Sequence, residues 1–248
     1  MDMTEIRDRA ADLFATEACQ NFPETTPTAI TPEMIEWCQS FGANSPQYVP
    51  VQQDPCGIYG FCNIGVTEKI RTDGGTIRFG WLIWEYPRVF LTAEFHSVWV
   101  SPAGDLTDIT PKPGRETQIV FAPDASYLPD FDFLKRPNNR RLRIYRAADT
   151  RPLVGETIAG FNASQRAYET RRATKKGMTL EQWVASRRFP IDPLPDLIDS
   201  FLCDADKRDT LFTPTPIGAR CSRPHRALQL GNSMAQKLRQ IRAFLGEE

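Results

Sequence analysis

Two neighbouring runs of β-branched and aromatic residues constrain the fold of this chain more than any other feature. The first run extends from Thr76 to Trp84, and the second, the strongest in the sequence, extends from Val89 to Val100. Tyr86-Pro87-Arg88 lies between them and favours a turn, because proline fixes one backbone dihedral and has no N–H to donate to a strand ladder. The two runs therefore predict a long antiparallel hairpin near the middle of the chain.

The segments on either side of this hairpin predict more strands and one helix. Asp105 to Thr110 and Glu116 to Phe121 have the composition of strands, and Ser101 to Gly104 favours a tight turn. Upstream, Cys62 to Arg71 has apolar residues at helical spacing, and it follows an irregular loop from Asn44 to Tyr59. We therefore expect an α+β fold, in which an antiparallel β-meander lies beside a helix that begins at Cys62.

Helices are predicted at both ends of the chain. Residues 4–20 are amphipathic, and Thr31-Pro32-Glu33 is a helix start with threonine as N-cap and proline in the first turn. The later helices are expected at Thr157–Lys175, Thr179–Arg187, Leu194–Leu202 and Leu228–Leu245. We accordingly divide the chain into an α+β core, residues 1–150, and a mainly helical region, residues 151–248, packed on that core.

Composition argues against several classes of protein. A formal net charge of −1 over 248 residues gives no overall field that would attract nucleic acid or an anionic membrane. No secretory signal and no run of 18 apolar residues is visible, so export and membrane insertion are not expected. The six cysteines are then expected to be reduced thiols in the cytoplasm. No cofactor-binding motif is recognisable, and we expect no cofactor.

Cys62, His96 and Asp108 form the candidate catalytic set. A cysteine attacks as the thiolate, and a helix N-terminus, such as the one expected at Cys62, lowers a thiol pKa because it favours negative charge. His96 is one of only two histidines and would act as the base that pairs with the thiol. A carboxylate usually orients such an imidazole, and Asp108 lies on the next predicted strand.

The predicted turn supplies a geometric test of this set. If the turn is centred on Pro102, residues whose numbers sum to about 204 face each other, and His96 then faces Asp108. Opposed residues of an antiparallel pair point to the same face, with Cβ atoms about 5 Å apart. Asp108 would thus reach the imidazole, and Asp105, closer to the turn, is the alternative carboxylate.

Candidates for holding the substrate lie on both sides of the cysteine. The backbone N–H of Cys62 and one side-chain donor would stabilise the oxyanion of an acyl-transfer intermediate. Gln53 is favoured as that donor, with Gln52 and Tyr59 as alternatives, and Asn63 is a further candidate beside the thiol.

Three tryptophans are candidates for the substrate cleft. Trp81 and Trp84 lie three positions apart on one predicted strand and must point to opposite faces. One of them therefore suits the cleft and the other the core. Trp99, three residues after His96, is the third candidate.

The same segment resembles a group of poorly characterised bacterial proteins. That group carries a Cys-Asn step, a Gly-Gly pair and three strand motifs in a fixed order. The matching residues here are Cys62-Asn63, Gly74-Gly75, Gly80-Trp81-Leu82-Ile83-Trp84-Glu85, Glu94-Phe95-His96-Ser97-Val98-Trp99 and Asp108-Ile109-Thr110-Pro111. The resemblance covers about 60 of the 248 residues and implies no particular substrate.

A more distant likeness is to papain-like and transglutaminase-like enzymes. Their histidine strand often reads His-x-Trp and their aspartate strand Asp-Pro-Thr, whereas this chain has His96-Ser97-Val98-Trp99 and Asp108-Ile109-Thr110-Pro111. The likeness implies Cys62 as nucleophile, His96 as base and Asp108 as the group that orients it. It also implies a hydrolase or acyltransferase that acts on a peptide, a protein or a small amide.

Two alternatives from other classes stay open. The first is a non-catalytic binding module in which Cys62 is a buried neutral thiol and the cleft holds a peptide. The second is a zinc-binding protein, which would use either of two sets of residues, Cys56, Cys62 and His96 or Cys203, Cys221 and His225. Nucleic-acid binding through the basic runs 140–143 and 171–176 is a weaker alternative, and the sequence does not predict an oligomeric state.

Overall fold

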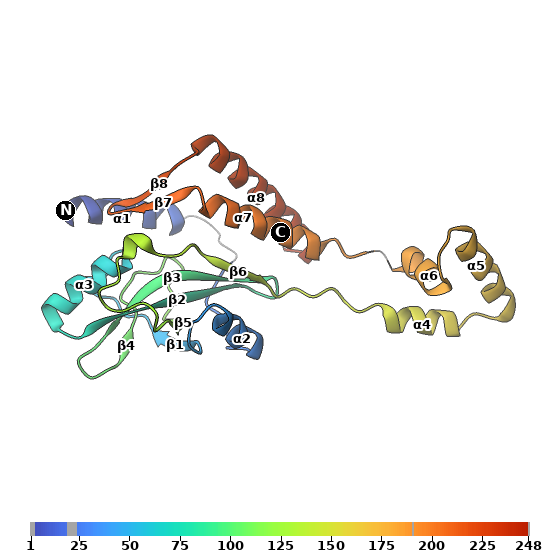
Figure 1. The fold of residues 1–248 in the computed structure, drawn as a ribbon, viewed down its shortest axis with the longest axis horizontal. Coiled ribbons are helices and arrows are strands. Elements are labelled where there is room, and N and C mark those ends of the chain that lie inside the picture. Colours follow the sequence, from blue (N-terminus) through green and yellow to red (C-terminus); the bar gives the residue numbers. More distant parts are fainter. Residues whose placement is uncertain (1–2, 19–23, 190, 248) are drawn as a thin grey trace. The chain divides into compact units, whose positions relative to one another are not determined.

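A computed structural model describes residues 3–18, 24–189 and 191–247 of the chain (Figure 1). The chain divides into two compact units, one formed by Met1–Ile144 with Ile198–Glu248 and the other by Tyr145–Leu197. The region expected at residues 151–248 is therefore shared between the two units, because its last part belongs with the sheet.

The first unit contains an antiparallel sheet, as the sequence predicted. Its strands run in the order β1-β5-β2-β3-β4, and β6 also pairs with β3. The two longest strands, β2 and β3, form the predicted central hairpin, in which Gly80 is paired with His96. The bounds are β1 Gln47–Pro50, β2 Thr76–Tyr86, β3 Phe90–Val100, β4 Leu106–Thr107, β5 Gln118–Pro123 and β6 Arg140–Arg143.

The predicted meander is confirmed only for β2, β3 and β4, which are neighbours in chain order. The next strand, β5, does not continue beside β4 but pairs with β2 on the other side of the hairpin. Ile119, Val120, Phe121 and Ala122 are all buried, so both faces of β5 are apolar. A strand of that composition is more stable inside a sheet, between β1 and β2, than at an edge that faces solvent.

Two short strand pairings formed where none was predicted. β1 lies inside the expected loop at residues 44–59, and β7 (Phe212–Thr215) pairs with β8 (Gly218–Cys221) in the region expected to be helical. The pairing of β1 with β5 supplies the backbone partners that its four residues cannot provide locally. Tertiary pairing therefore decided the structure of β1, whereas β7 and β8 form a local hairpin across residues 216–217.

The helices of the first unit begin close to the predicted positions, but α7 ends at Asp209 and not at the expected Leu202, and α8 begins at Pro224 and not at Leu228. α1 spans Met3–Ala18, and the last two residues of the expected helix, 19 and 20, lie outside the described residues. In α2 (Pro32–Ser40) the Thr31 side chain accepts a hydrogen bond from the backbone N–H of Met34, which confirms it as N-cap. The others are α3 (Cys62–Asp73), α7 (Leu194–Asp209) and α8 (Pro224–Leu245).

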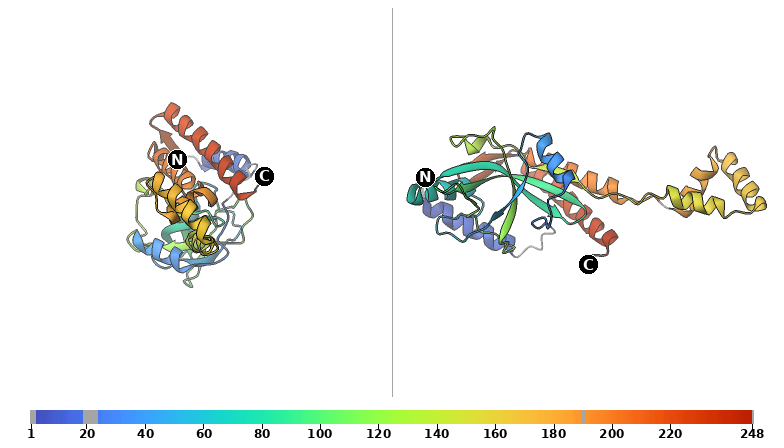
Figure 2. Two further views of the ribbon diagram at one scale, coloured as in Figure 1. Left: turned by 90° about the vertical axis from the view of Figure 1, so that its right-hand side faces the viewer. Right: turned by 90° about the horizontal axis from the view of Figure 1, so that it is seen from below.

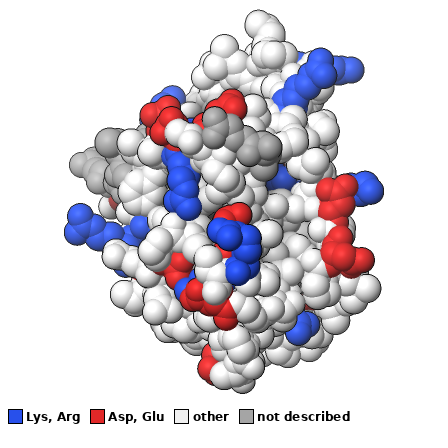
Figure 3. Space-filling model, turned by 90° about the vertical axis from the view of Figure 1, so that its left-hand side faces the viewer, with Lys and Arg blue, Asp and Glu red and all other residues white. Residues whose placement is uncertain are grey.

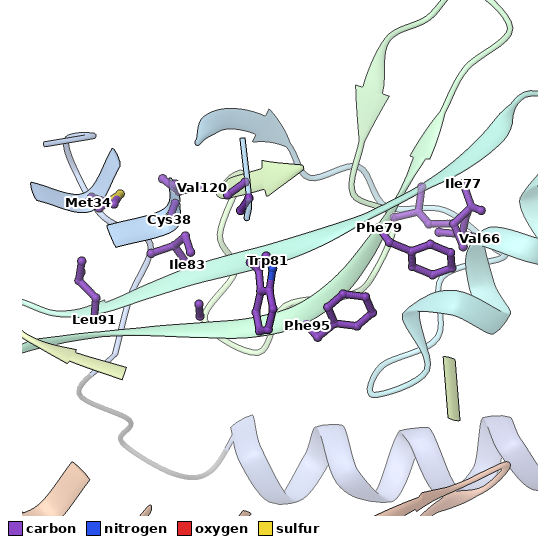
Figure 4. Close-up of a cluster of buried hydrophobic side chains, with 14 residues drawn as sticks. Met34, Cys38, Val66, Ile77, Phe79, Trp81, Ile83, Leu91, Phe95 and Val120 are labelled. Carbon is purple, nitrogen blue, oxygen red and sulfur yellow. The ribbon is translucent and has the colours of Figure 1, made fainter. Parts of the chain in front are cut away.

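The main hydrophobic core lies on one face of the β2–β3 hairpin. Phe79 and Trp81 of β2 and Phe95 of β3 pack on this face with aromatic ring contacts (Figure 4). Val66 of α3 and Met34 of α2 close the same cluster. Both helices therefore cover one side of the sheet. α3 packs against the β2–β3 hairpin, whose second strand, β3, carries the candidate histidine.

The opposite face of the hairpin is covered in part by the C-terminal helices. The ring of Phe90, at the start of β3, lies 5.4 Å from the ring of Phe201 in α7. α7 and α8 are joined where Asp204 of α7 accepts hydrogen bonds from Ser233 and Lys237 of α8. The views in Figures 1 and 2 show these two helices side by side.

The second unit is a group of three helices with its own small core. α4 (Arg151–Ala159), α5 (Ala163–Lys175) and α6 (Leu180–Arg188) pack around Trp183, which is 9% exposed. The helix expected at residues 157–175 is therefore two helices, separated at Gly160 and restarted by the Asn162 cap. The predicted capping box of Thr179 and Gln182 is present at the start of α6.

Charges of both signs are distributed over the surface. On the face drawn in Figure 3, lysine and arginine side chains lie among aspartate and glutamate side chains, with broad uncharged areas between them. Within the described residues, no helix has the length and apolar character needed to cross a bilayer.

Candidate active site

The site lies in a gap along one edge of β3. One edge of this strand pairs with β2 over its whole length. The other edge pairs with β6 at Phe90–Ala93 and with β4 at Trp99–Val100. Among the described residues, no strand pairs with residues 94–98 on that second edge. His96 and Ser97 lie within this gap, where the backbone and side chains of β3 can be reached by groups from outside the sheet.

The N-terminus of α3 brings Cys62 to this gap. Phe61 is the N-cap and Cys62 the first residue of the helix, as the sequence predicted. The following turn packs closely on the preceding loop, because a Cβ atom at Gly65 would lie 2.7 Å from the carbonyl oxygen of Cys56. Cys62 is only 7% exposed, and His96 and Ser97 are the residues of β3 whose charge and polar groups act on its thiol.

Asp108 lies directly after β4 and binds the imidazole of His96. Its Oδ2 is 3.1 Å from the His96 Nε2, and the aspartate is completely buried. Backbone hydrogen bonds with Pro50 and Gln52 fix its main chain, and its Oδ1 accepts a bond from the Thr110 N–H at 2.8 Å. Because Asp108 occupies Nε2, Nδ1 is the ring nitrogen of His96 that remains for a second partner.

The register between β3 and β4 differs from the predicted one by two residues. Trp99 is paired with Thr107 and Val100 with Leu106, so the turn is centred one residue later than expected. The turn is closed by a backbone bond from the Ser101 N–H to the Asp105 carbonyl oxygen, at 2.9 Å. A change of two residues leaves the same side chains on each face of the sheet. Asp108 therefore reaches His96 diagonally, and the alternative carboxylate Asp105 stays in the turn.

Lys112 completes the site and was not predicted. Its Nζ lies 2.7 Å from the Asp108 Oδ2, and its side chain is 4% exposed. The lysine follows Asp108 by four residues, but this spacing has no special meaning outside a helix. Only the folded loop after β4 brings the two side chains together, so no signal in the sequence would have identified the lysine.

The pKa shifts of Cys62, His96 and Asp108 each favour the charged form of the side chain. Burial alone would raise the pKa of the Cys62 thiol, but the positive charge of His96, together with the polar groups of His96 and Ser97, brings it below its usual value. Burial opposes the charge on His96, yet the negative charges of Asp108 and Cys62 raise the pKa of His96 to about 10. The pKa of Asp108 is held well below its usual range, despite burial, by His96 and Lys112.

This pattern balances charge inside the protein. The directions for Cys62, His96 and Asp108 each favour the charged form, and when all three are ionised they and Lys112 carry no net charge. A buried charge is tolerated when it is paired and hydrogen-bonded. Cys38 shows the contrast, because burial without a cationic partner raises the pKa of its thiol to about 12.

Two pockets lie on either side of the start of α3. The larger, about 510 Å³, is lined by apolar side chains that include Ile77, Phe79 and Phe131. The smaller, about 210 Å³, is lined by Phe61 and Arg136 among others. Asn63 and Phe133 line both pockets and so lie between them, whereas neither Cys62 nor His96 lines either pocket.

Of the predicted oxyanion donors, the structure places only Asn63 at these pockets. Gln53 is exposed and lines neither pocket. Gln52 instead donates its backbone N–H to the carbonyl oxygen of Asp108. Tyr59 packs against Phe14 of α1 with ring centroids 5.4 Å apart. The loop before α3 therefore leaves the Gln53 side chain exposed and away from both pockets.

The three candidate tryptophans lie away from the two pockets. Trp81 and Trp84 do point to opposite faces, since they belong to different core clusters. Trp81 is fully buried and donates to Asp124, and Trp84 donates to Glu94 on the opposite face. Trp99 donates to the Gly74 carbonyl oxygen. None of the three lines either pocket beside Cys62.

The structure also places the candidate zinc ligands and the two basic runs of the sequence. In the part of the chain that is described, no three histidine, cysteine, aspartate or glutamate side chains are grouped so that they would hold a metal ion. The first basic run is used internally, since Arg141 binds Asp206 and Asp209 of α7, and Arg143 binds Asp199. The second run lies at the C-terminal end of α5.

Comparison with known proteins adds no assignment to this geometry. No family model, no curated protein and no solved structure matches the chain. The chemistry of the site is therefore argued from its own residues.

Proposed function

We propose that this protein is a thiol-dependent hydrolase or acyltransferase whose nucleophile is Cys62. The observation that carries the proposal is the buried group of Cys62, His96 and Asp108, in which His96 lies 3.1 Å from Asp108 and its positive charge lowers the pKa of the Cys62 thiol. A thiolate paired with an imidazolium is the activated form of a cysteine nucleophile, and a carboxylate on the second ring nitrogen fixes the imidazole. The distant likeness to papain-like and transglutaminase-like enzymes supports the same assignment.

The reaction follows from these positions. The Cys62 thiolate attacks the carbonyl carbon of an amide, and a C–S bond forms while the oxyanion is held by the Cys62 N–H and the Asn63 side chain. His96 gives its proton to the leaving nitrogen as the C–N bond breaks, which leaves a thioester. Water or an amine then attacks the thioester, returns a proton to His96 and releases the product as the C–S bond breaks.

A non-catalytic binding module is the second candidate. The observation that favours it is the burial of Cys62, whose 7% exposure leaves little room for a substrate carbonyl. Cys62 also lines neither of the two pockets near the start of α3. In this interpretation, the charged row would stabilise the fold and the pockets would hold a partner.

Alkylation separates these candidates. Iodoacetamide labelling at about pH 6, followed by peptide mapping, measures the reactivity of each cysteine in one sample. We expect Cys62 to be labelled first, well before the exposed Cys203, because only a thiol with a lowered pKa is ionised at that pH. Cys38 is the internal negative control, since it is buried and its pKa is raised to about 12.

Two variants test whether the imidazole is responsible. His96→Ala should lose the selective labelling of Cys62, and Asp108→Asn should weaken it, because the imidazolium then lacks its carboxylate partner. Circular dichroism checks that each variant is folded. If Cys62 in the folded wild type is labelled no faster than Cys203, the thiolate–imidazolium pair is absent and the binding-module candidate takes its place.

A further inference from the structure

The smaller pocket beside Cys62 has one charged group and no acidic one. Its lining includes Phe61 and Asn63, the residues immediately before and after the nucleophile, and the guanidinium of Arg136. Thr215 and Gly218, from the hairpin of β7 and β8, close the far side. Cys62 itself does not line the pocket, but its negative charge acts on the Arg136 guanidinium, so a group bound there lies near the thiol and meets a cation without meeting a carboxylate.

Arg136 has hydrogen-bonding capacity that the protein does not use. Its guanidinium lies 4.9 Å from the ring centroid of Phe133 and donates one bond, at 3.4 Å, to the Phe133 carbonyl oxygen. No carboxylate of the described residues lies within ion-pair distance of it. A guanidinium has five N–H donors in a planar fork that matches a carboxylate. Most of that fork is therefore free to receive a ligand.

The electrostatic surroundings agree with this geometry. Burial lowers the pKa of Arg136, and the negative charges of Cys62 and Glu94 oppose that change. The cation is thus partly removed from water without a bound anion beside it. Such a group gains from an anionic ligand, because the pairing offsets the cost of its desolvation.

We propose that this pocket binds a carboxylate and that the substrates of Cys62 are acyl compounds or amides bearing one. Arg136 would hold the carboxylate, and the larger apolar pocket beyond Asn63 and Phe133 would hold an uncharged portion of the substrate. This inference rests on the proposed function, since it names the substrate class of the same nucleophile. An N-acylated amino acid, or a peptide with a free C-terminus close to the scissile bond, has the required chemistry.

Two alkylating reagents of nearly equal size test the inference. Iodoacetate carries a carboxylate and iodoacetamide does not, and each transfers its carbon to the thiolate with loss of iodide. The measured quantity is the ratio of their second-order rate constants at Cys62, divided by the same ratio for a small neutral free thiol. The ratio cancels any change in the ionisation of Cys62, because both reagents attack the same thiolate.

We expect iodoacetate to be favoured at Cys62 by about tenfold or more relative to the free thiol, the range of a hydrogen bond to a charged group. Arg136→Gln should abolish this preference, and Arg136→Lys should keep part of it. Arg208→Gln is the matched control, because it removes a cation that lines the neighbouring pocket but not the one beside Cys62. The control should keep the wild-type ratio.

The outcomes separate this inference from the proposed function. If Cys62 reacts with neither reagent in the folded protein, both are wrong. If Cys62 reacts quickly with iodoacetamide but shows the ratio of the free thiol, the nucleophile stands and the carboxylate pocket is rejected. Equal loss of the preference in Arg136→Gln and Arg208→Gln would also reject it, since the effect would then come from net charge.

Discussion

Replacing Lys112 with methionine removes one cation from the buried row of charges and keeps most of the side-chain volume. The lysine Nζ lies 2.7 Å from the Asp108 Oδ2, and both side chains are almost fully buried. At an effective dielectric constant of about 20, Coulomb attraction at this distance is about 6 kcal/mol. The desolvation of the lysine offsets part of it. Removing one partner of a buried pair costs roughly 3 to 5 kcal/mol of unfolding free energy, which is our expectation for Lys112→Met.

Urea unfolding followed by tryptophan fluorescence measures this loss, since four of the five tryptophans belong to the first unit. With an m-value of about 2 to 3 kcal/mol per molar urea, the midpoint should fall by roughly 1 to 2.5 M. Lys135→Met is the matched control, because its ion pair with Asp132 is largely exposed and should contribute less than about 1 kcal/mol.

A double-mutant cycle isolates the interaction of Lys112 with Asp108. Asp108→Asn with Lys112→Met leaves no unpaired charge between these positions, so the double variant should be more stable than the sum of the single effects predicts. The reasoning is refuted if Lys112→Met loses no more stability than Lys135→Met. Simple additivity of the two single variants would likewise show that the two side chains are not coupled.

Five further predictions concern pH and backbone conformation. The rate of Cys62 alkylation should level off below the pH at which an ordinary thiol ionises, because its pKa is lowered, and any hydrolysis should decline as His96 loses its proton near pH 10. Asp108 has a depressed folded-state pKa, so its stabilisation is present above about pH 4 and is lost as the pH falls further. The stability difference between wild type and Asp108→Asn should therefore shrink in acid, and a constant difference would contradict this assignment. The raised pKa of His96 has the opposite sign, with stabilisation present below about pH 6.5 and lost as the pH rises to about 10. Gly75→Ala should destabilise the first unit by about 1 to 3 kcal/mol, because Gly75 has φ +85° and a Cβ would overlap a carbonyl oxygen of β3. Gly155→Ala, in the open interior of α4, should stabilise the second unit by up to about 1 kcal/mol in thermal unfolding.

The sequence by itself determined the elements that carry the site. The β-branched and aromatic runs specify the β2–β3 hairpin, because strand preference and turn chemistry act over a few neighbouring residues. The start of α3 at Cys62 and the caps at Thr31 and Thr179 are local for the same reason. Local sequence patterns are therefore enough to place the cysteine on a helix N-terminus and the histidine and aspartate on or beside two adjacent strands.

Tertiary structure alone decided how those elements meet. The apolar run of β5 fits beside β4 or beside β2 equally well in a sequence pattern, and burial of both its faces selects β2. The turn at Ser101 moved the register by two residues, which a preference for a turn cannot resolve. The gap between β4 and β6 arises because both strands pair with one edge of β3 from distant parts of the chain.

The charged groups of the site show most clearly which properties the sequence determines and which the fold determines. Residue type fixes which groups can ionise, but burial and distance set their pKa values, and both are properties of the folded chain. Nothing in the sequence distinguishes Lys112 and Arg136 from the lysines and arginines that are expected on a protein surface. Folding buries the lysine against Asp108 and brings the arginine, 74 residues after Cys62 in the chain, to the pocket beside that cysteine.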